Sequence, residues 1–277
     1  MYEHMRKPIT RQFSINSFFT AYDYNWNSTY QSEGEAHDFW EIVYVASGAV
    51  GVTEDDRVYH VVEGNILLHA PMEFHNICSA EGTHPHVVIL SFDATGELPK
   101  SLTEGPFPLS NEMRAQYESI FADVKAFVDD PEQNKTQGQE GADRLASFLL
   151  RLNRRYRSEL SLMKTGSAIE YTRLVETMNK AIYENLSLEE LAAARHISIS
   201  YIKQLFKRYA GISPKAYYAR LRCTEAIRQL QAGSSVTEVS DALHFSSPSY
   251  FSAFFKKMTG QPPARYVRQR QSEWETE

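Results

Sequence analysis

The stretch SLEELAAARHISISYIKQLFKRYAGISPKAY (187–217) returns in altered form as SVTEVSDALHFSSPSYFSAFFKKMTGQPPARY (235–266). Two Leu, an Ala and a His in the first half recur 48 residues later as two Val, an Ala and a His, and a Phe, Gly, Pro and Tyr recur unchanged 49 residues later. The second copy therefore has one extra residue, placed in its Ser- and Pro-rich turn. Such a repeat is usually one supersecondary unit. Each copy is predicted to be two short helices around a tight turn, a helix-turn-helix.

Charge is unevenly distributed along the chain. Residues 1–164 hold 14 Lys and Arg against 24 Asp and Glu, a net charge of −10, whereas residues 165–270 hold 15 against 8, a net charge of +7. Three more acids in the last residues bring the total to −6. An acidic front half and a basic back half are expected when only one domain meets phosphate. The repeat therefore predicts a DNA-reading domain.

The second helix of each copy is expected to be apolar on one side. The predicted buried residues are Ile202, Leu205, Phe206 and Tyr209 in the first copy and Tyr250, Phe251, Phe254 and Phe255 in the second. The opposite sides carry Ser200, Lys203, Gln204 and Lys207, and Ser247, Ser249, Ser252, Ala253 and Lys256. Short polar side chains of this kind suit a major groove. A helix over 214–231, opened by proline, would hold the units about 27 Å apart, which lets both enter successive grooves.

Length and composition limit the class of protein. With 277 residues and 42% hydrophobic content, the chain is expected to form two or three domains with real cores. Cys78 and Cys223 have no paired spacing, which suits reduced thiols inside a cell. No segment has the apolar run of a signal peptide or a membrane span. The sequence predicts a cytoplasmic protein without a membrane partner.

Between Phe13 and Phe92 the sequence consists of short β-prone runs separated by turns. Strands are predicted at 41–47, 49–54, 57–62, 65–70 and 86–92, with Asp55 and Asp56 in a hairpin turn. Strands at roughly ten-residue spacing predict an antiparallel sandwich or barrel.

Two clusters in this β region contain His and Glu residues. The spacing of Glu35, His37, Glu41 and Gly48, followed by the run from Gly64 to His75 and Asn76, resembles the two halves of the cupin barrel motif over about 60 residues. The resemblance implies metal ligands at Glu35, His37, Glu41 and His75, although Glu35 stands where the family usually has His. Two His and a carboxylate can hold an open ferrous or zinc site. The alternatives are polar lining of a metal-free ligand pocket, which we favour, and structural hydrogen bonding.

The same region is rich in aromatic residues. The predicted ligand-binding residues are His37, Trp40, Glu41, Tyr44 and His75. The aromatic members either belong to the barrel core or provide flat faces on which a sugar can stack. The sequence does not separate these two interpretations.

Helical periodicity begins after a Gly- and Pro-rich connection. Apolar residues at spacings of three and four predict a helix from Ser110, its N-cap, to about Asp129. The run DDPEQNKTQGQEG interrupts the pattern, and a second helix is predicted near 142–160. These helices either pack only within the chain or also form a dimer interface. After a linker, another helix is predicted over 167–185, with Ile169 among its inward residues.

The stretch 167–270 resembles the C-terminal domain of the AraC/XylS family of bacterial transcription regulators. The similarity includes the run Ser-Tyr-Phe-Ser…Phe-Lys-Lys…Gly…Pro…Tyr over 249–266, and a cupin-like domain ahead of it is the family's commonest arrangement. The resemblance implies base-reading positions at Ser200, Lys203 and Gln204 and at Ser249, Ser252 and Ala253. The family often has Arg at the position of Ala253, so the second unit is expected to read less sequence. The phosphate candidates are Lys207, Lys256 and Lys257.

These observations predict a multidomain α and β protein. The expected domains are a cupin-like, ligand-binding β-barrel (1–105), a helical segment with a possible role in dimerisation (106–160), a linker (161–166), a double helix-turn-helix domain (167–270) and an acidic tail (271–277). The predicted function is a ligand-responsive, sequence-specific transcription regulator of carbohydrate or related small-molecule metabolism, with no catalytic residues and no cofactor. The expected partners are promoter half-sites in double-stranded DNA, a small effector such as a sugar, a second copy of the chain, and RNA polymerase. The alternative is a metal-dependent cupin enzyme with an appended regulatory helical domain.

Overall fold

The computed structural model describes residues 9–80, 82–155 and 165–266. The chain divides into two compact units, Met1–Met163 and Lys164–Glu277. Residues 156–160 of the predicted second helix, most of the linker and the predicted acidic tail lie outside the described residues.

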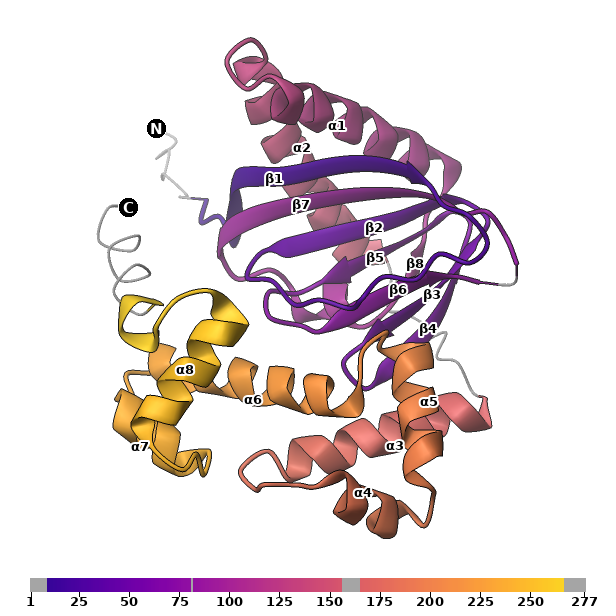
Figure 1. The fold of residues 1–277 in the computed structure, drawn as a ribbon. Helices are drawn as coiled ribbons and strands as arrows, with labels where there is room; N and C mark the ends of the chain where they lie inside the picture. The colour runs from indigo at the N-terminus through magenta and orange to yellow at the C-terminus, as the bar shows by residue number, and fades with distance from the viewer. Residues whose placement is uncertain (1–8, 81, 156–164, 267–277) are drawn as a thin grey trace, which may run out of the picture. The chain divides into compact units, whose positions relative to one another are not determined.

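The N-terminal unit contains two antiparallel sheets, one of five strands in the order β1-β7-β2-β5-β8 and one of three in the order β4-β3-β6. The bounds of the strands are β1 Phe13–Asn25, β2 Trp40–Ser47, β3 Ala49–Glu54, β4 Arg57–Val62, β5 Asn65–His69, β6 His75–Ser79, β7 His86–Gly96 and β8 Phe107–Pro108. The two sheets face each other as a sandwich of the cupin-like kind, and the described strands do not close into one continuous barrel (Figure 1).

The predicted strands are confirmed. All five predicted runs are strands, and Asp55 and Asp56 form the turn between β3 and β4, with Asp55 at a φ of 44°. The sequence did not predict β1, β6 or β8 as separate strands. The strand β6 is short and mixed, HNICS, so it lacks both the alternation and the apolar run that mark a strand.

The five-stranded sheet is covered on both faces. Ile42 and Tyr44 of β2 belong to a core shared with the helices, whereas Val43 and Val45 belong to a core shared with the three-stranded sheet. This division follows from strand geometry, in which successive side chains point to opposite faces. The near-continuous apolar sequence of β2 is explained by its burial on both faces.

Two helices, α1 (Asn111–Asp129) and α2 (Lys135–Arg155), pack on the outer face of that sheet (Figure 1). Ser110 is the N-cap of α1, as predicted, and its hydroxyl accepts a hydrogen bond from the Met113 amide. The helix α2 begins earlier than the predicted start at 142. A Cβ built on Gly138 would lie 2.5 Å from the Phe127 ring. The glycine that weakened the helical pattern is therefore the residue that lets α2 approach α1 closely.

The C-terminal unit contains only helices among its described residues: α3 Gly166–Lys180, α4 Leu188–Arg195, α5 Ile199–Tyr209, α6 Pro214–Gln231, α7 Val236–Ala242 and α8 Pro248–Thr259. The pairs α4–α5 and α7–α8 are the two predicted helix-turn-helix units, and α6 connects them (Figure 1). Ser187 and Ser235 each begin a complete capping box. The chain turns at equivalent residues, His196 and His244, which have φ of 54° and 51°. None of the described helices has the length and apolar content needed to cross a bilayer.

Two residues that were predicted to be buried in this unit are exposed. Tyr250 is 61% exposed and Ile169 is 41% exposed. In α8 the buried side is formed by Phe251 and Phe255, four residues apart, and Phe254 is only half-buried. Tyr250 lies about 100° around the helix from Phe251, which turns it toward solvent. The prediction placed two pairs of aromatic residues, 250–251 and 254–255, on one buried side, but only the second residue of each pair is fully buried.

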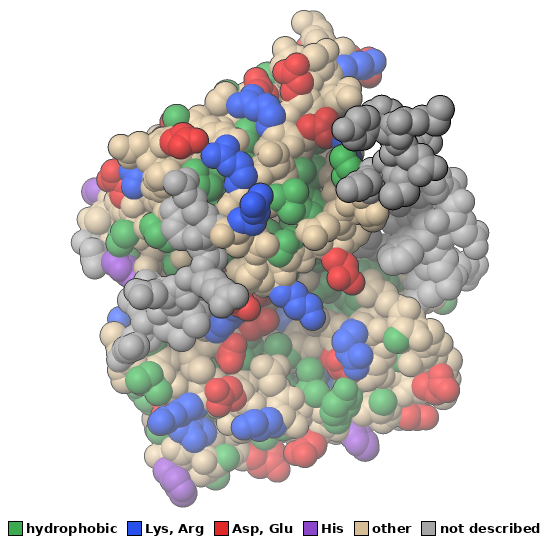
Figure 2. Space-filling model, turned by 180° about the vertical axis from the view of Figure 1, so that it is seen from behind, with side chains coloured by type: hydrophobic (Ala, Val, Ile, Leu, Met, Phe, Trp, Pro, Cys, Tyr) green, Lys and Arg blue, Asp and Glu red, His purple; other side chains and the backbone are tan. Residues whose placement is uncertain are grey.

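Surface charge is mixed on the face of the molecule shown in Figure 2. Lys and Arg side chains and Asp and Glu side chains are interspersed there, with hydrophobic side chains between them. The charge difference between the two halves of the sequence does not form one uniform patch on that face.

Candidate functional site

A row of polar side chains crosses the inner face of the five-stranded sheet. Thr20 lies opposite Ser91, Ser91 opposite Glu41, and Glu41 opposite His69, on the adjacent strands β1, β7, β2 and β5. Directly opposed residues of adjacent strands point to the same face. The hydroxyl oxygens of Thr20 and Ser91 are 2.7 Å apart, and the Ser91 hydroxyl donates to Glu41 at 3.4 Å. This row lies beside the apolar inner-face residues Val43, Leu67 and Ile89.

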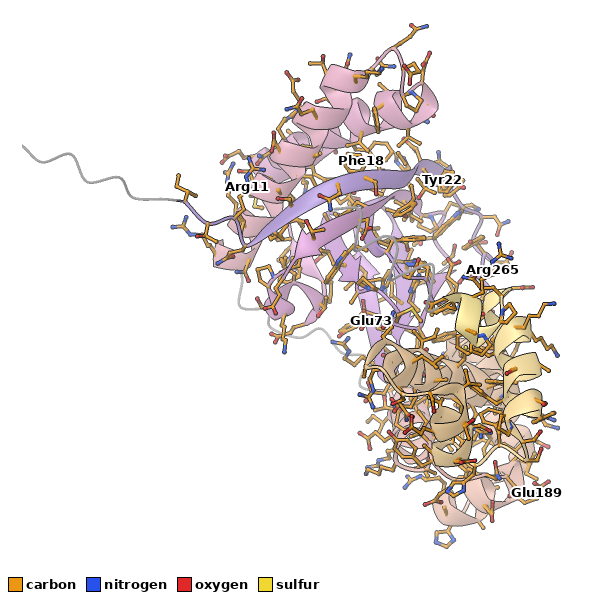
Figure 3. All side chains as sticks on the ribbon, turned by 90° about the vertical axis from the view of Figure 1, so that its left-hand side faces the viewer. Arg11, Phe18, Tyr22, Glu73, Glu189 and Arg265 are labelled. Carbon is orange, nitrogen blue, oxygen red and sulfur yellow. The ribbon has the colours of Figure 1, made fainter. Side chains whose placement is uncertain are left out.

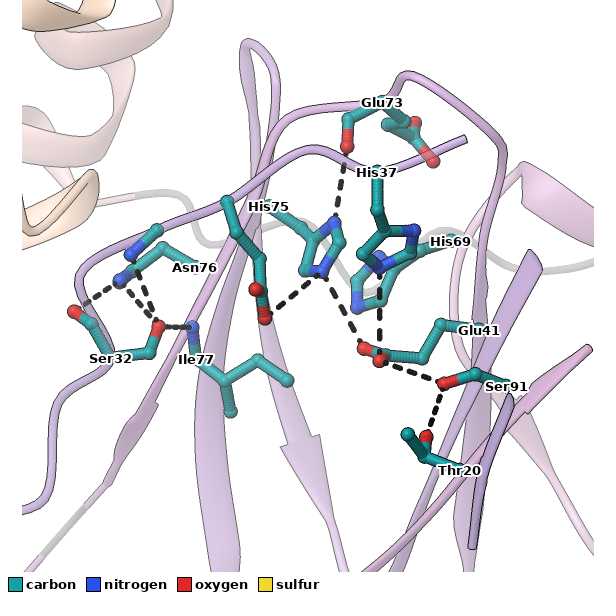
Figure 4. A network of polar contacts seen from close by, with 12 residues as sticks. Thr20, Ser32, His37, Glu41, His69, Glu73, His75, Asn76, Ile77 and Ser91 are labelled. Carbon is teal, nitrogen blue, oxygen red and sulfur yellow. Dashed lines mark hydrogen bonds and ion pairs between the residues drawn. The ribbon is translucent and has the colours of Figure 1, made fainter. Parts of the chain in front are cut away.

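The facing sheet and its flanking loops contribute a second set of polar groups (Figure 4). His75 Nε2 is 3.5 Å from Glu41 Oε1, and His69 Nδ1 is 2.9 Å from Glu54 Oε1. The rings of His69 and His75 stack with centroids 4.0 Å apart. We call the complete set the polar layer: Thr20, His37, Glu41, Glu54, His69, Glu73, His75 and Ser91.

The hydrogen bonds of two imidazoles determine what they present to the polar layer. His37 Nδ1 lies 3.0 Å from the Phe39 carbonyl oxygen, and His75 Nδ1 lies 3.1 Å from the Glu73 carbonyl oxygen. Because a carbonyl oxygen can only accept, both Nδ1 atoms are assigned a hydrogen. Nε2 of each ring then faces Glu41, at 3.8 Å from His37 and 3.5 Å from His75. Both Nε2 atoms are buried without a hydrogen-bond partner.

Burial and neighbouring charges shift the pKa values of His37, Glu41 and His75 in different directions. Burial would lower the pKa of His75, but its contacts with Glu41 outweigh burial and raise it. The same pair lowers the pKa of Glu41 against the effect of burial. Burial lowers the pKa of His37, and the neighbouring His75 lowers it further. His75 and Glu41 therefore form an ion pair, whereas His37 presents an unprotonated acceptor to the same carboxylate.

A metal ion would fit one part of the polar layer. Ligand atoms of His37, Glu41 and His75 all lie within 4.8 Å of one another. Both His residues donate their other ring N–H to a carbonyl oxygen, as metal-binding imidazoles usually do. The Glu35 carboxylate is 4.0 Å from His75 Nε2 but is 66% exposed, so it lies at the solvent side. These residues could hold a divalent transition ion, which would supply Lewis acidity.

The second group of possible metal ligands fits an ion less well. Ligand atoms of Glu54, His69 and Glu73 also lie within 4.8 Å of one another. However, the Arg57 guanidinium lies 3.4 Å from Glu54 and 2.5 Å from Glu73, and it already supplies positive charge to both carboxylates. Burial still raises the pKa of Glu54, to about 8. We interpret this group as a structural network around a buried carboxyl.

The predicted ligand-binding residues do not all lie together. His37, Glu41 and His75 meet in the polar layer. Trp40 and Tyr44 instead belong to the core beneath the helices, where the rings of Tyr44 and Tyr117 have centroids 5.4 Å apart. The reason is the alternation of β2, which turns residues 40 and 44 away from residue 41. The two aromatic residues therefore cannot stack on a ligand held by Glu41.

Sequence reasoning missed several members of the polar layer. His69 and Glu54 are fully buried, and Ser91 and Thr20 complete the row. The ending of the apolar run NILLH in a His was a usable signal, because a buried His at a strand end needs a partner. The partners themselves depend on strand register, which the sequence does not show.

A groove of about 750 Å³ lies elsewhere in the same unit, between β1 and the ends of α1 and α2. Arg11 and Phe18, labelled in Figure 3, are among its lining residues, and none of the predicted ligand-binding residues is. Arg11 pairs with Asp143 at 3.4 Å, and both side chains are exposed. The groove is open to solvent, and Arg11 and Asp143 in its lining pair at the surface.

The predicted DNA-contacting residues have the exposure that this role requires. Ser200, Lys203, Gln204 and Lys207 are exposed on α5. On α8, Ser249, Ala253, Lys256 and Lys257 are exposed, and Ser252 is half-buried. Ser247, which was expected on the outer side of α8, is instead the N-cap, and its hydroxyl accepts from the Tyr250 amide. The two surfaces differ in charge along the helix, because α8 has its lysines only in the last turn.

Comparisons with known proteins agree with this division of the chain. A family model described as an AraC-like ligand binding domain matches residues 17–150, and one described as a helix-turn-helix domain matches residues 191–269. The HTH-type transcriptional regulator YobQ of Bacillus subtilis is 40% identical over 86 residues, which cover 31% of this chain and 36% of that protein. The regulator YidL of Escherichia coli is 25% identical over 236 residues, or 83% of this chain and 75% of YidL.

A solved structure of ToxT from Vibrio cholerae matches 95% of this chain and 97% of its own at 16% identity. Its TM-score is 0.37. These comparisons give no support to the alternative of a cupin enzyme. The two domain matches show that the chain belongs to the AraC/XylS family of bacterial transcription regulators, with a cupin-like ligand-binding domain followed by a DNA-binding domain of two helix-turn-helix units.

Proposed function

We propose that this regulator binds paired promoter half-sites as a homodimer in the cytoplasm, and that a small hydroxyl-rich effector, such as a sugar, binds in the polar layer. In this proposal the N-terminal domain binds its ligand without transforming it. Effector binding changes how two DNA-binding domains engage the half-sites, and RNA polymerase is the partner that responds.

The excess of hydrogen-bond acceptors in the polar layer is the observation that supports this effector class. His37 Nε2 is buried without a hydrogen-bond partner and faces Glu41 Oε2, which accepts only from the distant Ser91 hydroxyl, while the other Glu41 oxygen is paired with His75. Buried acceptors that lack donors cost free energy. A ligand that brings several hydroxyl groups would satisfy them, and the ring of Phe39, stacked on His37 with centroids 3.8 Å apart, offers an apolar neighbour.

A divalent metal ion is a second candidate occupant, favoured by the same acceptors of His37, Glu41 and His75. The two can be separated by thermal unfolding of the full chain with sugars and polyols, each with and without a chelator. A ligand that binds the native state raises the midpoint. We expect a rise that survives the chelator, is lost in Glu41→Gln, and is retained in the exposed control Glu63→Gln. If the unfolding midpoint rises with metal ions and without any sugar or polyol, the effector is a metal ion and the sugar proposal is wrong.

In the DNA-binding domain we propose that Ser200, Lys203 and Gln204 contact base edges from α5, with Ser249, Ser252 and Ala253 at the corresponding places of α8. Lys207, Lys256 and Lys257 are proposed to contact phosphates. With three phosphate contacts per chain, the slope of log affinity against log salt is expected to be about −2.7 or steeper.

Binding of the purified chain to its own upstream region, compared with a random duplex over a range of salt, tests this assignment. We expect the upstream region to bind more tightly at every salt concentration. Equal affinity for both duplexes would refute sequence-specific binding.

A further inference from the structure

The most exposed aromatic side chain of the described DNA-binding domain lies on α8. Tyr250 is 61% exposed and is the third residue of the helix after the N-cap Ser247. Its equivalent in the first unit, Tyr201, is half-buried. An aromatic residue exposed at the start of a recognition helix has no role in the core of this domain, and exposed apolar side chains at such places mark contact surfaces.

The Tyr250 ring is supported from the protein side. It lies against Phe245, with ring centroids 6.1 Å apart. Phe245 is fixed in turn by Phe251, at 5.2 Å between centroids, and by the Arg222 guanidinium, 4.1 Å over its ring. The tyrosine therefore projects from a packed base, and it would lose little conformational freedom on meeting a partner.

The neighbours of Tyr250 on the outer side of α8 are small and uncharged. Ala253, one turn further along, is exposed, and residues three apart on a helix lie side by side. Ser249 is also exposed, whereas Lys256 and Lys257 come only in the last turn. Tyr250 and Ala253 thus form a short apolar strip in the half of the helix that meets base edges in a helix-turn-helix.

Only one base presents an apolar group in the major groove, namely thymine through its 5-methyl. We infer that the second unit reads thymine, through contact of the Tyr250 ring and the Ala253 methyl with that group. The inference rests on the proposed entry of α8 into the major groove. The second unit has alanine at residue 253, which cannot make a bidentate contact with a base, and it was therefore expected to read little sequence. The inference instead gives this unit a base preference of its own.

Replacement of single thymines by deoxyuridine tests the inference, since this change removes the methyl group alone. The probe is a duplex selected from a random library by the full chain. We expect wild type to bind about fourfold more weakly when one thymine in the half-element of α8 is replaced, the loss that corresponds to burial of one methyl. Tyr250→Ala should lose this sensitivity, and Tyr201→Ala should keep it. Because Tyr250 is exposed, the variant is expected to fold, which unchanged circular dichroism would confirm.

The outcomes separate this inference from the proposed function. If the chain selects a defined sequence but binds it equally well after every uridine replacement, the second unit does not read thymine. Specific DNA binding would still stand in that case. Retained sensitivity in Tyr250→Ala would assign the contact to another residue and also overturn the inference. If no sequence is enriched over the random library, the proposed function fails, and thymine reading fails with it.

Discussion

The carboxyl group of Glu54 is predicted to make the stability of the N-terminal unit depend on pH. Glu54 is fully buried between the two sheets, and burial raises its pKa from the ordinary value of 4.5 to about 8, although Arg57 acts in the opposite direction. Replacement by glutamine keeps the size of the side chain and removes the titration. Glu54→Gln should therefore weaken the pH dependence of unfolding.

The size of the effect follows from proton linkage. Between the unfolded pKa of 4.5 and the folded pKa of about 8, the folded state binds roughly one proton more than the unfolded state. Since the folded pKa is raised, the stability that this group provides is complete below about pH 4.5 and is lost as the pH rises. One proton corresponds to about 1.4 kcal/mol per pH unit. From about pH 5.5 to 7, Glu54 alone should remove about 2 kcal/mol from the free energy of unfolding.

Denaturant unfolding of the full chain, followed by tryptophan fluorescence, measures this quantity. Trp26 and Trp40 both lie in the N-terminal unit, and Trp274 is outside the described residues. We expect the free energy of unfolding of wild type to fall more steeply with pH than that of Glu54→Gln, by about 2 kcal/mol over this interval. The variant should retain some pH dependence, because burial also raises the pKa of Asp55 and of Glu73 to about 7.

The control for this experiment is Glu63→Gln, which removes the same charge from an exposed site. Its pH dependence should match that of wild type. Equal slopes for wild type and Glu54→Gln would mean that Glu54 is not protonated in the folded state, and the explanation of the buried network would then be wrong.

Five other substitutions test the helix contacts, one helix cap and the DNA-binding surface. Gly138→Ala should lower the free energy of unfolding by about 1–3 kcal/mol, since its Cβ would lie 2.5 Å from an aromatic ring. The control Gly166→Ala should cause no such loss, because no atom lies within 4 Å of the added Cβ. Chemical denaturation of both variants measures the difference. Ser187→Ala removes one capping box and should cost about 1 kcal/mol in the same assay, and no loss would show that the cap is replaced by solvent. Gln204→Ala should relax base preference, whereas Lys207→Ala should weaken binding to all duplexes evenly and reduce the salt slope by about 1. If both variants lose the same affinity for specific and for random DNA, the two residues do not have these separate roles.

The sequence was most informative where one local pattern determines one element. The proline that opens α6 and the N-cap at Ser110 were both predicted and confirmed, because each depends on residues only a few positions apart. The strands β2 to β5 and β7 followed from apolar runs between turn residues. Local chemistry of this kind survives folding with little interference from distant parts of the chain.

The candidate site was less predictable, since it depends on strand register. Glu41, Ser91 and His69 are neighbours only because β2 lies between β7 and β5 in one particular alignment. The resemblance to the cupin motif supplied His37, Glu41 and His75, but it did not indicate His69, which lies in the run from Gly64 to Asn76 and was not among the implied ligands. It also did not prevent the inclusion of Trp40 and Tyr44, which strand alternation alone would have excluded.

The internal repeat provides its own comparison between residues that build the domain and residues that face outward. Positions that the fold requires keep their type in both copies: Phe206 and Phe255 are fully buried, and His196 and His244 both have positive φ in the turn. Positions on the outer side have changed, with Lys203 and Gln204 in the first copy replaced by Ser252 and Ala253 in the second. Nothing in the packing of either unit requires this change, because three of the four side chains are exposed and the fourth is half-buried. The difference between the copies therefore concerns what each one meets outside the protein, and two different recognition surfaces predict two half-elements of different base composition rather than a direct repeat.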